Sequence, residues 1–391
     1  MVVESSLRST ALEAARDLAP AIRDAATRID AERCLPRPLV LKIARAGIFK
    51  TFLPVARGGG GASLPEALAV IEEVARADGS SGWCVAQGIN TFRASQQLSE
   101  ETARALFFAD PIGVSAGSAG VRGTGVAVEG GYRVNGRWTF ASGCMHASTL
   151  HGGITVLDGE TPRRRPNGGV EERICYFPLD GAVIEDSWNV SGLRGTGSHD
   201  VVVTDLFVPE AHSFPRNVLR ADRPTPAGLI PGYDLAALNF ATVGLGVARA
   251  AIDEVIALAT TKTPRYASAL LGERALTQHT LALAEATLSA GRAFHFGMAA
   301  EIWETATSGQ SLQPMQRART RLAATHAAAC AVQAVELVRS VTGTTGIFLS
   351  SPLERYVRDV HVVTTHIQLQ LNTYEAAGRL LLGMESNSPM F

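Results

Sequence analysis

Residues 125–143 read GVAVEGGYRVNGRWTFASG and set the middle of the chain apart from its two ends. Alternating apolar residues on both sides of Gly130-Gly131 are typical of two strands joined by a tight turn, and Asn135-Gly136 supplies a second turn signal. The pattern continues in apolar runs of strand length at residues 150–157, 174–179 and 201–208. Short strands separated by glycine and proline predict a small central β-barrel or sandwich.

The segments on either side have the periodicity of helices. Ser63-Leu64-Pro65-Glu66 forms a capping box, and Ser99, followed by two glutamates, predicts another helix start. Long alanine-rich helices that suit an antiparallel bundle are expected at residues 236–260, 275–307, 314–341 and 352–382. We therefore predict a mainly helical α+β fold with an N-terminal helical domain (1–110), a central β domain (111–220) and a C-terminal four-helix bundle (221–391).

Composition excludes several classes of protein. The 391 residues are 46% hydrophobic and 19% charged with a net charge of -1, so no basic surface for nucleic acid is indicated. The five cysteines form no C-x-x-C pair, so we expect neither a metal site nor a disulfide framework. No signal peptide is evident, and no apolar run approaches the roughly 20 residues of a membrane span. A soluble cytoplasmic protein is expected.

Most catalytic motifs are absent. No G-x-G-x-x-G follows a strand, and there is neither a Walker A loop nor an H-E-x-x-H. Residues 113–117 (GVSAG) match the G-x-S-x-G elbow of hydrolases. That elbow needs alternating strands and helices before it, whereas only helices are expected here. The hydrolase alternative is therefore not favoured.

Four motifs follow one another along nearly the whole chain. They are Leu53-Pro54 and Gly58-Gly59 with DGSSGW at 78–83; GYRVNGRW at 131–138 with Ser142-Gly143; Trp188 and GLRGTGS at 192–198 with FVP at 207–209; and RDVH at 358–361 with His366. In this order they resemble the acyl-CoA dehydrogenase superfamily, and especially its oxygenase branch, which includes the large components of two-component phenol hydroxylases. The resemblance implies the same order of helical domain, β domain and bundle.

The resemblance also implies a flavin between the β domain and the bundle. It places Trp138, Ala141 and Ser142 against the isoalloxazine ring, with Ser142 as the hydrogen-bond partner of N5, and Ser118 on the pyrimidine side. The alternative from the residues alone is that Trp138 belongs to the core and Ser142 to a turn.

A glycine-rich segment completes the implied flavin site. Gly343 and Gly346 match the segment that in the family approaches a flavin phosphate or adenosine across a subunit boundary. Glycine permits such a close backbone approach. A turn that ends a helix explains the same two residues.

The position that separates dehydrogenases from oxygenases lies near the C-terminus. Dehydrogenases of this fold remove a proton with a glutamate set some eight residues past the Arg-Asp pair. This chain has His366 there, and no acid occurs between Asp359 and Glu375. The resemblance to hydroxylases implies that His366 acts on a C4a-hydroperoxyflavin or on the substrate. Imidazole can take the proton of a phenol-like substrate or hydrogen-bond the peroxide.

Further candidates come from the other motifs. The resemblance implies that Trp83, Asn90, Arg194 and Ser198 border the substrate. A structural role for Arg194 explains the same motif. Several hydroxylases have a second histidine near position 90, where this chain has Gln87, Asn90 and Thr91. That departure argues against a simple phenol as substrate.

These observations lead to one expected function. We expect a two-component flavin-dependent monooxygenase that takes reduced FMN or FAD from a separate NAD(P)H:flavin reductase. With O2 it would hydroxylate or N-oxygenate a small aromatic or polyketide-like substrate, and the family implies a homotetramer. The alternatives are an acyl-CoA dehydrogenase or oxidase with a relocated base, and a non-catalytic member of the fold that binds flavin or another ligand.

Overall fold

The computed structural model of the chain describes residues 3–216 and 225–388. Its first part is helical, with five α-helices: α1 (Val3–Glu32), α2 (Arg37–Arg45), α3 (Leu64–Ala77), α4 (Gly79–Ser95) and α5 (Glu100–Phe107). Both expected helix starts are confirmed. Ser63 Oγ accepts from the Glu66 amide while Glu66 accepts from the Ser63 amide, and Ser99 caps α5. These signals are reliable because each satisfies orphan N–H groups locally.

One mixed sheet follows the helices. Its strands are β1 (Ser115–Val128), β2 (Gly131–Trp138), β3 (Thr149–Asp158), β4 (Thr161–Pro162), β5 (Glu172–Phe177), β6 (Val183–Glu185), β7 (Asp200–Pro209) and β8 (Ser213–Pro215). Their order is β6-β7-β2-β1-β3-β5-β8, with β4 beside β3, and only β1 and β3 pair in parallel. Among the described residues the two edge strands, β6 and β8, are not paired with each other, so the expected barrel is open along one side.

The second turn signal in this region is wrong. β2 continues through Asn135-Gly136, and the register with β7 shifts there by one residue. The extra residue lies on β7, where Asp205 adopts φ 46° and its amide donates to Asn135 Oδ1 at 2.9 Å. The asparagine therefore stabilises a β-bulge in the neighbouring strand rather than a chain reversal.

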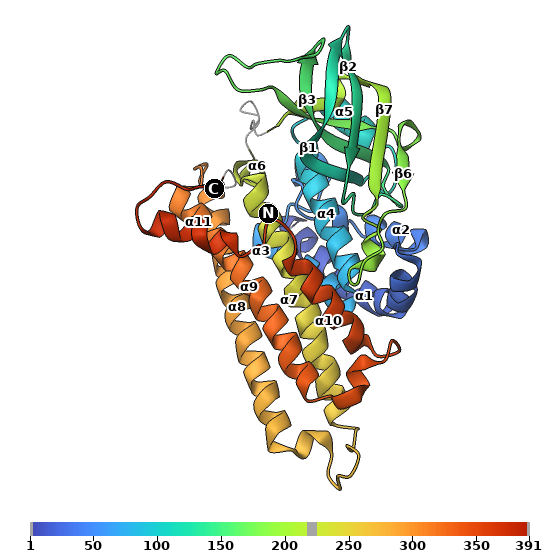
Figure 1. The fold of residues 1–391 in the computed structure, drawn as a ribbon, viewed down its shortest axis with the longest axis vertical. Helices are drawn as coiled ribbons and strands as arrows, with labels where there is room; N and C mark the ends of the chain where they lie inside the picture. Colours follow the sequence, from blue (N-terminus) through green and yellow to red (C-terminus); the bar gives the residue numbers. More distant parts are fainter. Residues whose placement is uncertain (1–2, 217–224, 389–391) are drawn as a thin grey trace.

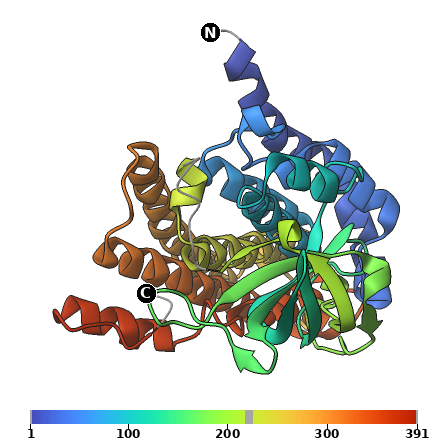
Figure 2. The same cartoon turned by 90° about the horizontal axis from the view of Figure 1, so that it is seen from above.

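The C-terminal part is a bundle that extends away from the sheet (Figure 1). Its helices are α6 (Pro226–Leu229), α7 (Gly232–Ala259), α8 (Ala275–Thr307), α9 (Pro314–Ser340), α10 (Pro352–Thr364) and α11 (Asn372–Leu381). The segment between α9 and α10 contains the short 3-10 helix η7 (Gly343–Ile347). Helices α7 to α10 pack side by side, while α11 and the first turns of α1 project from the body (Figure 2).

The single helix expected at residues 352–382 is wrong, because it breaks after Thr364. The hydroxyls of Thr364 and Thr365 donate to the carbonyls of His361 and Val362, three residues earlier. Such bonds compete with the helical ladder, and two adjacent β-branched residues favour its end. The chain then turns through His366 before α11 begins, so His366 lies in a turn and not within a helix.

Two hydrophobic cores hold these parts together. One core joins the N-terminal helices to the bundle, because α3 packs against α7. This contact is close: a Cβ on Gly246 of α7 would lie 2.5 Å from the Glu72 carbonyl of α3. The other core lies within the sheet. The domain limits at residues 110 and 220 stay predictions, and residue 220 falls outside the described residues.

Helix α7 differs from the expectation that no segment is apolar enough to cross a membrane. By length and composition it qualifies, with a mean hydropathy of 1.6 in its most apolar window. However, 89% of that window is buried inside the fold. Helix α7 is surrounded by α3, α9 and α10. Its central place in the core explains why it is apolar on all sides.

Candidate active site

Four separate segments meet where the helices reach the sheet. The indole of Trp83 on α4 stacks on Phe240 of α7, with ring centroids 4.2 Å apart. The His366 imidazole lies 4.3 Å from the Phe240 ring and 5.4 Å from the Trp83 ring. Trp83 Nε1–H donates to Ser142 Oγ at 3.1 Å, in the loop that follows β2. Three residues singled out in different motifs, Trp83, Ser142 and His366, are thus brought together.

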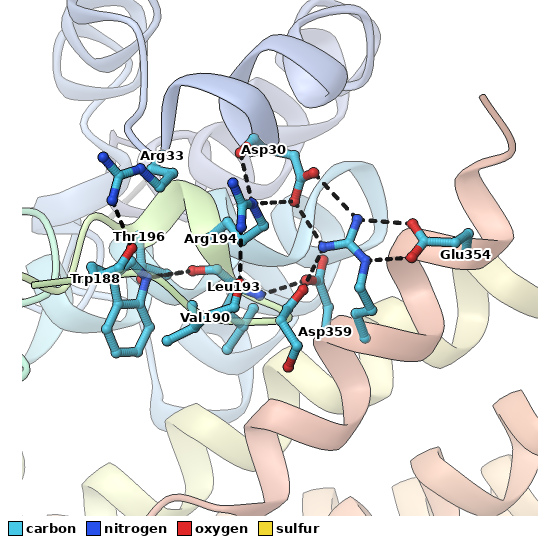
Figure 3. A network of polar contacts seen from close by, with 11 residues as sticks. Asp30, Arg33, Trp188, Val190, Leu193, Arg194, Thr196, Glu354 and Asp359 are labelled. Atoms are coloured by element: carbon cyan, nitrogen blue, oxygen red, sulfur yellow. Dashed lines mark hydrogen bonds and ion pairs between the residues drawn. The ribbon is translucent and has the colours of Figure 1, made fainter. Parts of the chain in front are cut away.

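Ser198 joins the same cluster through its hydroxyl. Its Oγ lies 2.7 Å from Ser142 Oγ and 2.7 Å from Thr196 Oγ1. The Thr196 hydroxyl in turn donates to the Leu193 carbonyl at 2.8 Å. All three hydroxyl side chains are buried. A continuous row of hydrogen bonds therefore links Trp83 to the 193–198 loop, part of which is shown in Figure 3.

The environment of His366 keeps its imidazole neutral. Its Nδ1 accepts from the Gln368 amide at 3.3 Å, and Gln368 Oε1 accepts from the guanidinium of Arg321. Burial among the rings, together with the positive charge of Arg321, lowers the pKa of His366 to about 4. At neutral pH the ring is therefore uncharged and offers one acceptor and one donor.

An amide pair borders the cluster. Asn239 Nδ2–H on α7 donates to Asn90 Oδ1 on α4 at 2.8 Å. Asn239 Oδ1 is buried and has no hydrogen-bond partner among the described residues. Sequence reasoning singled out Asn90 and missed Asn239. The available signal was a lone amide beside Phe240 within the mostly apolar stretch 235–248.

Two predicted site residues, Arg194 and Trp138, make hydrogen bonds within the fold. Arg194 points toward α1, where its Nε–H donates to the Asp30 carbonyl at 3.2 Å and its Nη1–H to the Val190 carbonyl at 2.9 Å (Figure 3). Trp138 has no exposed surface, and its Nε1–H donates to the Gly153 carbonyl at 3.0 Å inside the sheet core. These contacts favour structural roles, and the assignments of Arg194 to the substrate and of Trp138 to the flavin stay predictions.

A different aromatic residue occupies the surface beside Ser142. Phe140 is 65% exposed and adopts φ 63°, a left-handed conformation that non-glycine residues rarely take. Its ring packs edge-on against Trp188. Ala141 lies between the two, buried, with its amide bonded to the His199 carbonyl at 3.1 Å. Sequence reasoning missed Phe140 because the strand ends before it.

The remaining candidates are Ser118 on β1 and the two glycines Gly343 and Gly346. Ser118 is on β1, beside a break in the register with β3, and its Oγ accepts from the Gly120 amide. Gly343 and Gly346 belong to η7, which Lys262 ties to the end of α7 by bonds to Thr342 and Thr345. The 28-residue α7 is about 42 Å long, and Phe240 lies near its other end. The two glycines lie beyond the far end of α7 and are therefore remote from Phe240 of the same chain.

The residues around Ser142 suit a flavin. A flat aromatic ring system needs an apolar face and a hydrogen-bonding group at its edge. Phe140 and Met145, 65% and 54% exposed, provide apolar surface on either side of the Ser142 turn. Ser142 provides the polar group, and its oxygen keeps a lone pair after its two hydrogen bonds.

Comparison with known proteins decides the family. Residues 5–104 match the N-terminal domain of acyl-CoA dehydrogenases, and residues 238–371 match their C-terminal domain. The indole-3-acetate monooxygenase of Pseudomonas putida is 32% identical over 93% of this chain and 92% of that protein. This chain belongs to the flavin-dependent monooxygenases of the acyl-CoA dehydrogenase superfamily. The expected enzyme class is thereby confirmed, and reduced flavin is its cofactor.

Other members of the superfamily agree in sequence and in fold. The oxygenase subunit HsaA of Mycobacterium tuberculosis, a flavin-dependent monooxygenase, is 29% identical over 91% of this chain and 90% of that protein. XiaF from a Streptomyces species, solved with FADH2 and glycerol, has a TM-score of 0.89 at 21% identity, covering 99% and 98% of the two chains. The expected fold is confirmed by this likeness.

Proposed function

We propose that this flavin-dependent monooxygenase is the oxygenase component of a two-component system and oxygenates a small aromatic substrate beside the cluster of Trp83, Phe240 and His366. The observation that carries the proposal is the cluster of three rings beside Ser142, with a neutral histidine where a dehydrogenase needs a carboxylate. Stacked aromatic walls bind planar ligands well. The relatives include an indole-3-acetate monooxygenase and a resorcinol hydroxylase, which supports an aromatic substrate.

Each residue contributes a defined interaction. Reduced flavin, when bound, would activate O2 and supply the oxygen atom. Ser142 and Phe140 would hold the edge and face of the ring, and the aromatic walls would exclude water. His366 is neutral and accepts from the Gln368 amide at Nδ1, so its hydrogen lies on Nε2, which would donate a hydrogen bond to an oxygen of the substrate and orient it. The amide pair of Asn90 and Asn239 offers a further acceptor for a polar substituent.

The first expected result concerns the reaction of reduced flavin with O2. Reduced FMN and reduced FAD, each mixed anaerobically with the protein and then with O2, should reoxidise more slowly than the same flavin alone. The physical reason is that a dry apolar site shields the flavin from proton exchange with water. Stopped-flow absorbance measures this rate. Reoxidation as fast as that of free flavin would contradict the proposal, and bleaching of oxidised flavin by acyl-CoA would favour the dehydrogenase alternative.

We also infer a homotetramer. Apolar side chains are exposed on the outside of the bundle, at Leu276, Leu283, Phe294, Ile347, Phe348, Leu349, Leu381 and Leu382. Such a surface is typical of a subunit interface. An interface at η7 would also explain how Gly343 and Gly346, remote from Phe240 in their own chain, could serve the flavin of a neighbouring subunit.

Assembly is tested by changing the most exposed residue of this surface. Light scattering should give a particle of four 41.3 kDa chains. The substitution Leu349→Glu, at a side chain 81% exposed in the single chain, should reduce that mass because it would bury a charge. Val183→Glu, 63% exposed on β6, is the matched control and should leave the mass unchanged. A wild-type particle of one chain would contradict the inference.

The state of the cysteines bears on the location of the enzyme. All five cysteines are unpaired, and four of them are buried. Free thiols of this kind suit a reducing compartment. We therefore propose that the enzyme works in the cytoplasm with a soluble NAD(P)H:flavin reductase as its partner.

A further inference from the structure

The hydroxyl row beneath the site has a fixed direction, which follows from counting hydrogens. A hydroxyl has one hydrogen to donate and can accept two, whereas an indole N–H only donates and a carbonyl only accepts. At one end of the row, Trp83 Nε1–H must donate to Ser142 Oγ. At the other end, the Leu193 carbonyl must accept from Thr196 Oγ1, 2.8 Å away.

These two ends determine the bonds between them. The only hydroxyl hydrogen of Thr196 is used on Leu193, so in the 2.7 Å contact between Thr196 and Ser198 the donor is Ser198. The hydrogen of Ser198 is then used as well. In the 2.7 Å contact between Ser198 and Ser142 the donor is therefore Ser142. Reversing the row would leave Thr196 Oγ1 and the Leu193 oxygen as two acceptors in contact.

Burial makes this direction firm. Ser142, Ser198 and Thr196 are 6%, 3% and 2% exposed, so water does not readily replace any of the bonds. Hydrogen bonds that run in one direction also polarise and strengthen one another. The far end is anchored because the Leu193 amide donates to Asp359 at 2.6 Å and Trp188 Nε1–H donates to the Leu193 carbonyl (Figure 3).

The consequence lies at Ser142. Its one hydrogen points to Ser198 and one lone pair accepts from Trp83, so the only capacity left is a second lone pair. Ser142 can therefore accept a further hydrogen bond but cannot donate one. Reduced flavin carries a hydrogen on N5, whereas N5 of oxidised flavin has only a lone pair. An acceptor-only partner suits the reduced form alone.

We propose that Thr196 and Ser198 make the site selective for the reduced flavin, by holding the Ser142 hydroxyl in an acceptor-only orientation. This proposal rests on the proposed function, in which Ser142 faces N5. Thr196 is then a positioning residue that sets which redox state of the cofactor binds. Such selectivity suits an oxygenase that receives its flavin already reduced and must release it after oxidation.

The test compares the affinities of the two redox states. Dissociation constants for oxidised flavin in air and reduced flavin under anaerobic conditions are measured for the wild type and for Thr196→Val. Valine keeps the shape and removes the acceptor, so Ser198 can donate to Ser142, and Ser142 can turn its hydrogen toward N5. The preference for reduced flavin should fall about fivefold, the worth of one ordinary hydrogen bond. Ser198→Ala should lower the preference in the same way.

The chain offers a closely matched control. Thr51 is also buried, and its hydroxyl donates to the Ile48 carbonyl, three residues earlier, at the same 2.8 Å. Thr51→Val should leave the preference unchanged. If Thr196→Val and Ser198→Ala both keep the wild-type preference, the proposal is overturned while the proposed function stands. If the wild type binds flavin in neither redox state, the proposed function itself fails.

Discussion

Replacing His366 by alanine is expected to lower the rate of substrate oxygenation about 100-fold, at the lower end of what one positioned acid–base group contributes. The imidazole lies 4.3 Å from the Phe240 ring and 5.4 Å from the Trp83 ring, so a substrate bound against this cluster would meet it directly. Burial and Arg321 lower its pKa to about 4, so it is a neutral hydrogen-bond partner at working pH. Without it the substrate loses its orientation, while the residues around the flavin are untouched.

The measurement follows product formed and NADH consumed with a flavin reductase present. His366→Ala should lower product formation while flavin reoxidation continues, so that NADH is spent without product. His361→Ala is the matched control, because His361 is exposed on α10 and bonds only to Glu336 at 2.9 Å. If His366→Ala oxygenates the substrate as fast as His361→Ala does, His366 has no role in the reaction.

The sequence predicted those features whose causes are local. Helix caps at Ser63 and Ser99 are read from four residues, and the structure confirms both. The structure brings Trp83, Ser142, Ser198 and His366 together. The sequence pointed to these four residues only through the motifs shared with the family, because no contact between them is visible in the sequence. Their roles remain proposals, whereas their proximity is a property of the fold.

The contacts of other candidate residues could not be predicted from the sequence, because long-range packing decides them. The motif around Arg194 does not reveal that its partner is Asp30, 164 residues away on α1. Trp138 and Phe140 are two positions apart, so their side chains would lie on the same face of a regular strand. Here β2 ends at Trp138 and Phe140 takes a left-handed conformation, so that one ring is buried and the other exposed. Only the backbone path resolves the choice.

The largest expected change in stability comes from Asp359→Asn. Asp359 is 1% exposed and lies against Asp78, the buried N-cap of α4, with Asp30, Arg355 and Arg358 as the other charged neighbours. Burial, and then the charge of Asp78, raise the pKa of Asp359 to about 7. One oxygen of each carboxyl, Asp78 Oδ1 and Asp359 Oδ2, has no hydrogen-bond partner within the described part of the chain. Two ionised carboxylates at this position repel each other.

The raised pKa fixes the sign of the pH dependence. The folded protein keeps its proton on Asp359 up to about pH 7, whereas the unfolded chain loses it near pH 4. The stability due to this group is therefore complete below pH 4 and is lost as the pH rises to 7. Three pKa units correspond to at most about 4 kcal/mol. Asparagine stays neutral and can still accept from the Leu193 amide, so Asp359→Asn should keep that stability at pH 8.

Urea unfolding at pH 5 and pH 8, at one protein concentration, measures the effect. The gain from Asp359→Asn should be several kcal/mol at pH 8 and clearly smaller at pH 5, where the wild-type carboxyl is protonated in the fold. Asp205→Asn, at a carboxylate 72% exposed on β7, is the control and should change stability by less than about 0.5 kcal/mol at either pH. A gain that is equal at both pH values would mean that Asp359 does not hold its proton. The Leu193 amide would then be held by a charged carboxylate, and the hydroxyl row that ends there would be anchored by an ion rather than by a neutral acid.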